Sequence, residues 1–165
     1  MPEGWYGYQD STGELAIGPE GSEDARLEFW IDVYAASDPS GNRDASIDGI
    51  TVWFVDMPII DVIERGPTTF GGLPAESIEY QRKAGAANKD PDCPAEIQPC
   101  AVEFGYPELD GAFSEGGAFH SRLVVLRASW GGQEHAVYAM FWAIGPAYAE
   151  LIDEARAVVD GARLP

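Results

Sequence analysis

Short runs of alternating apolar and polar residues dominate the first three quarters of the chain, and they predict a protein built mainly of strands. The clearest run covers 26–34, where Leu27, Phe29 and Ile31 alternate with Glu28 and Trp30. Successive side chains of a strand point to opposite faces, so this run has one fully apolar face. Shorter strands are expected over 5–9, 14–17, 59–64, 68–70 and 75–82, and 51–57 is either a strand or a short helix.

Two longer apolar runs, 118–128 and 135–144, are expected to be strands as well. The turn between them contains Gly131 and Gly132, a pair typical of a tight hairpin. Both runs are apolar on two faces, which predicts a central position in the sheet.

The chain closes with a helical pattern. Pro146 suits the start of a helix, since its missing N–H has no partner there in any case, and Gly161 suits the end. Between them, apolar residues recur at helical spacing. We therefore predict a single α+β domain over residues 1–165, with a mostly antiparallel sheet packed by a C-terminal helix as a two- or three-layer sandwich.

The charge of the chain excludes several partners. There are 28 acidic and 10 basic residues, which gives a net charge of -18. Nucleic acids and anionic membrane surfaces are bound through clustered lysine and arginine, so neither is an expected partner. No apolar run is long enough to cross a membrane, and the chain shows no export signal. An acidic solvated surface, adaptation to salt and attraction to a basic partner all fit this charge.

Cys93 and Cys100 are the only cysteines. Their spacing is not that of a redox motif, and the segment between them provides no histidine for a zinc site. We predict a disulfide, which would stabilise the fold by roughly 2.5 kcal/mol by closing a short loop. Such a bond implies an oxidising compartment outside the cytoplasm. The alternative is two separate reduced thiols.

The order of features in the second part of the chain resembles a known group. Residues 68–75 read TTFGGLPA, and a strand, the cysteine pair, the Gly-Gly hairpin, an aromatic strand and a helix ending near 162–165 follow. This resembles exported small lipoprotein domains of unknown function from actinobacteria, with a PsbP-like α/β/α sandwich. The resemblance implies an extracytoplasmic, membrane-tethered domain, and it assigns no catalytic residue.

His120 and His135 are the only histidines, and they flank the predicted hairpin. With Glu115 or Glu134 they could form a metal site or a general-base pair. The simpler interpretation is two surface histidines near strand ends. Nearby serines lack the GxSxG pattern of a hydrolase nucleophile, which argues against serine hydrolysis; they are Ser114, Ser121 and Ser129.

One polar loop carries oxygen ligands at nearly alternating positions, as calcium would need. It lacks the glycine and the final glutamate of an EF-hand, so a solvated acidic loop is the alternative. The residues are Asp38, Ser40, Asn42, Asp44 and Asp48.

Trp30 and Tyr34 share one face of the best strand with Glu28 and Asp32. Exposed aromatic groups on a sheet can stack on sugars or on apolar groups of a partner, so this set is a candidate binding face. Alternatively, other elements cover that face.

We therefore expect an exported, non-catalytic domain that binds a protein or a small ligand and needs no cofactor. The alternatives are a metal-assisted or general-base hydrolase that uses His120 or His135, and a structural subunit of an extracellular assembly.

Overall fold

The computed structural model describes residues 1–9, 15–22, 24–31, 34–35, 55, 60–82, 100–105, 112–116 and 119–164. The ten strands and one helix within these ranges are β1 (Trp5–Gln9), β2 (Leu15–Pro19), β3 (Ala25–Ile31), β4 (Tyr34–Ala35), β5 (Ile60–Phe70), β6 (Leu73–Arg82), β7 (Cys100–Gly105), β8 (Ala112–Gly116), β9 (Phe119–Trp130), β10 (Gln133–Ile144) and α2 (Ala147–Gly161).

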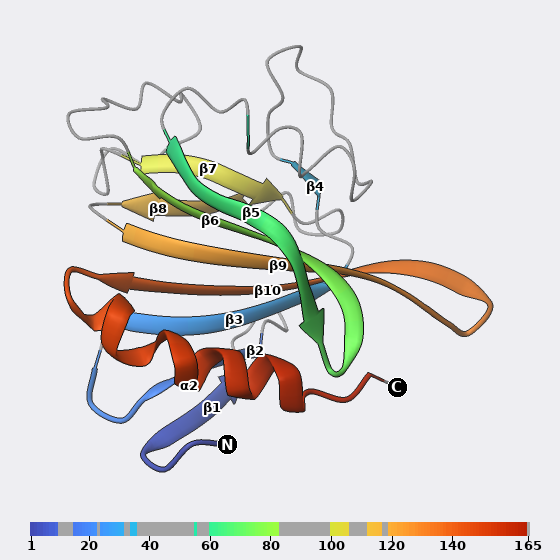
Figure 1. Ribbon diagram of the computed structural model, residues 1–165, viewed down its shortest axis with the longest axis horizontal. Coiled ribbons are helices and arrows are strands. Elements are labelled where there is room, and N and C mark those ends of the chain that lie inside the picture. Colours follow the sequence, from blue (N-terminus) through green and yellow to red (C-terminus); the bar gives the residue numbers. More distant parts are fainter. Residues whose placement is uncertain are drawn as a thin grey trace.

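The strands form two antiparallel sheets. The larger sheet has seven strands in the order β1-β2-β3-β10-β9-β6-β5, and the smaller has three in the order β4-β7-β8. Figure 1 shows the long strands β9 and β10 crossing the middle of the molecule. Their central position confirms the prediction, and consecutive residues of both strands, which point to opposite faces, are buried.

Tight glycine turns join the long strands in pairs. Gly131 and Gly132 link β9 to β10, while Gly71 and Gly72 link β5 to β6. All four have positive φ, a backbone region that glycine adopts without steric cost. Strand β5 runs unbroken from Ile60 to Phe70, so the two short extended segments predicted there are one strand.

Helix α2 begins after Pro146 and ends at Gly161, as the sequence predicts. Its apolar stripe contacts β10, β5 and β3. The core between helix and sheet contains Leu27, Phe70, Val124, Leu126, Ala139, Phe141, Tyr148, Ala155 and Val159. The helix thus closes one apolar face over the strands that it contacts.

The predicted sandwich, a sheet packed by the helix as a full layer, is wrong. A 15-residue helix is only about 22 Å long and about 10 Å wide, whereas seven strands spaced by about 4.8 Å make a much wider sheet. Figure 1 shows α2 along the lower part of the main sheet, with the upper parts of β5, β6 and β9 extending beyond it. The fold is mostly an antiparallel seven-stranded sheet with one C-terminal helix.

The opposite face of the main sheet is also buried. Tyr80, Tyr138 and Met140 are at most 1% exposed. The Tyr80 hydroxyl donates to Sδ of Met140 at 3.3 Å, which gives this buried phenol a polar partner.

Candidate functional site

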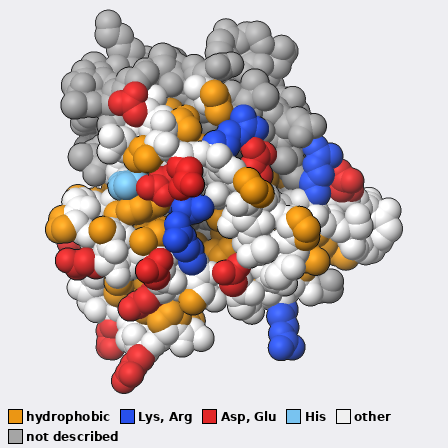
Figure 2. Space-filling view, viewed as in Figure 1, with side chains coloured by type: hydrophobic (Ala, Val, Ile, Leu, Met, Phe, Trp, Pro, Cys, Tyr) orange, Lys and Arg blue, Asp and Glu red, His pale blue; other side chains and the backbone are white. Residues whose placement is uncertain are grey.

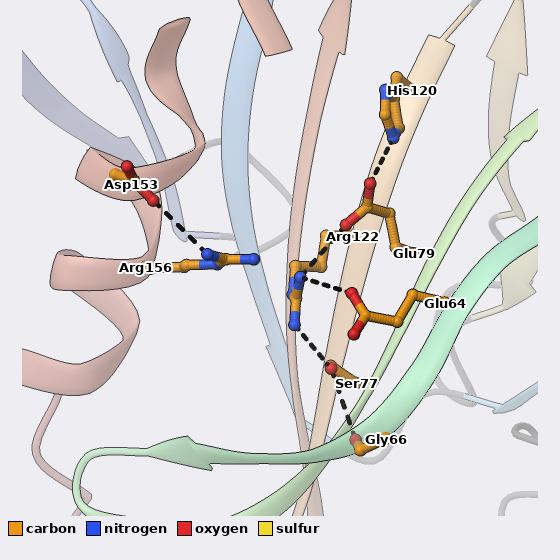
Figure 3. A network of polar contacts seen from close by, with 8 residues as sticks. All are labelled: Glu64, Gly66, Ser77, Glu79, His120, Arg122, Asp153 and Arg156. Atoms are coloured by element: carbon orange, nitrogen blue, oxygen red, sulfur yellow. Dashed lines mark hydrogen bonds and ion pairs between the residues drawn. The ribbon is translucent and has the colours of Figure 1, made fainter. Parts of the chain in front are cut away.

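A network of charged groups joins neighbouring strands on the helix-facing side of the main sheet (Figure 3). Glu79 of β6 lies directly opposite Arg122 of β9, so the two side chains meet across the strands. One oxygen of Glu79 lies 3.2 Å from Nη1 of Arg122, and the other lies 2.9 Å from Nε2 of His120. The side chain of Glu79 is 15% exposed and that of Arg122 is 11% exposed. The Glu79 carboxylate is therefore largely buried, and it lies between a guanidinium group and an imidazole ring.

His120 also contacts the helix. Its ring stacks on that of Tyr148 with 3.5 Å between centroids and 11° between planes. Burial raises the pKa of the Tyr148 phenol above its usual range, and the negative charge of Glu79 raises it further. The tyrosine therefore stays neutral at any physiological pH, and the stack fixes the start of α2 to β9.

The other side of Arg122 is held as firmly. Nη2 donates to the hydroxyl of Ser77 at 2.9 Å, and that hydroxyl lies 3.5 Å from the carbonyl oxygen of Gly66. Glu64 adds a longer ion pair of 3.9 Å. These contacts tie β5, β6 and β9 together, and they occupy the only serine hydroxyl that the network contains.

This arrangement does not assemble a hydrolase nucleophile. Ser77 is engaged by Arg122, and Ser121 is fully buried opposite Tyr80 on strand β6, whose side chain points away from the network. Within the described residues, His120 has the carboxylate of Glu79 as its partner, and the hydroxyl nearest to its stacked ring belongs to the phenol of Tyr148, a poor nucleophile while it stays protonated. The network is therefore built to hold strands and helix together.

The two histidines do not share a site. His120 pairs with Ala143, whereas His135 pairs with Ala128, eight steps further along the hairpin. At about 3.4 Å per residue they lie roughly 27 Å apart. His135 instead stacks on Trp130, with 3.9 Å between ring centroids. A hydrolytic or metal site that uses both histidines cannot form in this register.

Two of the four residues of the candidate binding face are buried. Trp30 is 4% exposed and Glu28 is 1% exposed, because both point to the buried side of β3 opposite the helix. Arg26 lies 3.5 Å from Glu28. The side chains of Tyr34 and Asp32 lie outside the described residues.

Other predicted features also lie outside the described part of the chain. These are Cys93, the side chain of Cys100, the calcium-loop set Asp38, Ser40, Asn42, Asp44 and Asp48, and the side chains of Ser114 and Glu115. The disulfide and the calcium loop remain predictions. Among the residues that the structure describes, no cluster of three metal-binding side chains occurs, and no helix there is long and apolar enough to span a membrane.

A concave surface lies at the far end of the hairpins. The turn of β5–β6, the end of β9 and the segment after α2 surround a pocket of about 560 Å³, which we call the hairpin-end pocket. Its apolar lining includes Phe70, Leu73, Trp130 and Leu164, and its charged lining is Arg127 and Arg163. No local sequence pattern predicts this pocket, because its three walls are distant in the chain and meet only through the sheet register.

The β5–β6 turn contacts the end of α2 through two hydrogen bonds. The amide of Gly71 donates to the carbonyl oxygen of Val159 at 2.9 Å. The hydroxyl of Thr69 donates to the carboxylate of Asp160 at 2.6 Å. These two bonds hold the walls of the hairpin-end pocket together.

Acidic and basic groups are distributed unevenly over the surface. On the face shown in Figure 2, most basic side chains lie beside acidic ones. The hairpin-end pocket differs, because no acidic side chain belongs to its lining. In a chain with 28 acidic residues, this makes the pocket a place where an anion meets little repulsion.

No family model and no curated protein sequence matches the chain. Among solved structures, cyanobacterial PsbP (CyanoP) from Synechocystis sp. PCC 6803 is similar with a TM-score of 0.42 and 10% identity, over 96% of this chain and 80% of that one. A protein of unknown function from Pseudomonas aeruginosa, PA94, is similar with a TM-score of 0.45 and 10% identity, over 98% of this chain and 97% of that one. A PsbP protein is thus among the similar structures, while no matching sequence supports a lipoprotein or actinobacterial relationship.

Proposed function

We propose that this protein is a non-catalytic binding domain, and that the hairpin-end pocket receives its ligand. The observation that carries the proposal is a pocket of about 560 Å³ with apolar and aromatic walls, two arginines and no acidic lining. Ligand sites in proteins have volumes of roughly 300–1,000 Å³ and combine apolar walls with a few polar groups. The polar network around Glu79 supports the non-catalytic part, since its groups are engaged with one another.

Protein-observed NMR titrations with a set of small anionic, neutral and cationic compounds test this proposal. We expect compounds that bind to shift amide signals of the pocket walls. We expect Ala128→Trp to abolish binding by filling the pocket, since Ala128 lines it on the same strand face as Trp130. Val62→Trp introduces the same side chain on strand β5 outside the pocket lining and serves as the control. If no compound perturbs the pocket walls at millimolar concentration, the proposal is wrong.

The hydrolase alternative has its own test. The purified protein is incubated with model esters, amides and phosphate esters, and His120→Gln is compared with the parent protein. Turnover that disappears in His120→Gln would establish an enzyme and overturn the binding proposal.

We also propose that the domain acts outside the cytoplasm and is akin to the small exported lipoproteins that it resembles. The spacing of Cys93 and Cys100 supports this location, because a disulfide persists in an oxidising compartment. Intact mass measured with and without reductant tests it: we expect a gain of two hydrogens on reduction. An unchanged mass would remove the argument for export and leave the binding proposal standing.

A further inference from the structure

All but one of the arginine side chains that the structure describes form ion pairs with carboxylates. Arg26, Arg65, Arg122, Arg127 and Arg156 each lie within 4 Å of a carboxylate. Arg163 alone, among the arginine side chains that the structure describes, has no such partner. In a chain with almost three acidic residues for every basic one, an uncompensated guanidinium is unexpected.

Arg163 stands at the hairpin-end pocket. It lies two residues beyond the last residue of α2, and it belongs to the pocket lining together with Leu164. Its guanidinium presents several N–H donors, whose geometry matches the two oxygens of a carboxylate. The free positive charge and the apolar walls therefore act on the same ligand.

The second arginine of the pocket has a different role. Arg127 lies 3.1 Å from Glu134 across the β9–β10 hairpin, so its charge is already compensated. Asp160, near the end of α2, accepts a hydrogen bond from Thr69. Neither Glu134 nor Asp160 forms an ion pair with Arg163 in the described part of the chain.

The indole ring of Trp130 forms one wall of the pocket. Trp130 lines the pocket and is stacked on His135 of the neighbouring strand, with 12° between their planes. A flat ring on a ligand can pack against this indole ring, and Leu73, which is 46% exposed, offers further apolar area.

Resting on the proposed function, we infer that the ligand is a small organic anion with a flat apolar body, such as an aromatic carboxylate. Arg163 binds its negative group, and the wall formed by Trp130 and Leu73 receives its ring. A neutral compound of the same shape keeps only the apolar contacts, and a cationic one is repelled.

The test uses three probes of one shape: 2-naphthoate, the neutral 2-naphthylmethanol and the cationic 2-naphthylmethylammonium. Affinities are measured by NMR titration of the full chain. We expect 2-naphthoate to bind about tenfold more tightly than the alcohol, which corresponds to one charge-assisted contact. Arg163→Gln should remove this difference while the affinity for the alcohol stays unchanged.

Arg65→Gln is the matched control. It removes the same unit of charge from the exposed edge strand β5, outside the pocket, so it should leave all three affinities as they were. Amide spectra of both variants establish that the fold is intact.

The outcomes separate the two proposals. Equal binding of naphthoate and the alcohol would overturn the anion preference and leave the pocket as a binding site. A preference for naphthoate that survives in Arg163→Gln, or that falls equally in Arg65→Gln, would overturn the role of Arg163. Absence of binding by all three probes would overturn both this inference and the hairpin-end pocket as the ligand site.

Discussion

Arg122 contacts polar groups of two neighbouring strands, β5 and β6. Its guanidinium bonds Glu79 and Ser77, and it is 11% exposed. Loss of one partner of a buried pair leaves the other charge without compensation, and this costs roughly 3–5 kcal/mol. Arg122 therefore links the β6 and β9 strands energetically as well as in space.

We expect Arg122→Gln to lower the free energy of unfolding by about 3 kcal/mol or more. Arg65→Gln breaks an exposed pair with Glu76 and should cost less than about 1 kcal/mol. Urea denaturation of both variants measures the difference. Equal effects would mean that the Glu79 network contributes no more than a surface ion pair.

Tyr148 predicts a dependence on alkaline pH. Because burial and Glu79 raise the pKa of its phenol in the folded state, the unfolded chain releases this proton first as the pH increases. The stabilisation of the folded state by protonated Tyr148 is complete below the pKa of the phenol in the unfolded state, near 10. This stabilisation is lost progressively above that pH.

The parent protein should therefore lose stability above pH 10 with an extra slope of up to about 1.4 kcal/mol per pH unit. Tyr148→Phe removes this proton and should show a shallower decline. Urea denaturation from pH 9 to about 11.5 compares the two. Parallel declines would show that Tyr148 ionises alike in both states.

The sequence could not identify this network residue by residue. Glu79 and Arg122 are separated by a long stretch of chain, and their contact depends on the register between β6 and β9. Alternation predicts on which face of a strand each residue lies, but it does not predict which residue of another strand lies opposite. Trp30 is a second example. Its polar neighbours on the same strand face suggested exposure to solvent, but Trp30 is buried in the fold.

At the scale of elements, the contact between the β5–β6 turn and the end of α2 depends on one glycine, Gly71. Gly71 has φ +58, and a β-carbon there would lie 2.5 Å from the carbonyl oxygen of Ala162. Gly72 has φ +79 and nothing within 4 Å of the same position. The two neighbours thus share backbone conformation but differ in their surroundings.

Gly71→Ala should destabilise the protein more than Gly72→Ala, which bears only the cost of left-handed backbone, about 1–2 kcal/mol. The extra loss reflects the displaced turn and the weakened bond from Gly71 to Val159. Urea denaturation measures the energies, and the amide shifts of α2 near its end report the displacement. Equal losses would mean that the contact with Ala162 relaxes freely.

Local signals made the hairpins and the helix predictable. Gly131 and Gly132 fix the β9–β10 turn, and Pro146 and Gly161 bracket the helix. The predicted sandwich failed because helical periodicity gives the length of a helix but not the width of the sheet below it. The small sheet of β4, β7 and β8 was not predicted, although Pro107, Asp110 and Gly111 between β7 and β8 are residue types typical of turns.

At the scale of the whole molecule, charge repulsion opposes compactness. A net charge of -18 on 165 residues raises the energy of the folded state more than that of the expanded chain. Salt screens such repulsion, with a Debye length of about 10 Å at 0.1 M.

We expect the melting temperature to rise by several degrees as sodium chloride increases from about 20 mM to about 0.5 M. Lithium chloride and potassium chloride should act alike if screening is the cause. A melting temperature that falls with salt would show that the internal ion pairs outweigh the repulsion among carboxylates.

The strand order also bears on how the protein is made. Strand β3 pairs with β10, although their partner residues lie more than a hundred positions apart. On the ribosome, β1 to β3 emerge long before β10, the strand with which β3 pairs, and α2 follows β10. Such non-local pairing slows folding into the range of milliseconds to seconds. Until β10 has been made, the apolar side chains of β3 lack this neighbouring strand, and aggregation competes with folding during that interval.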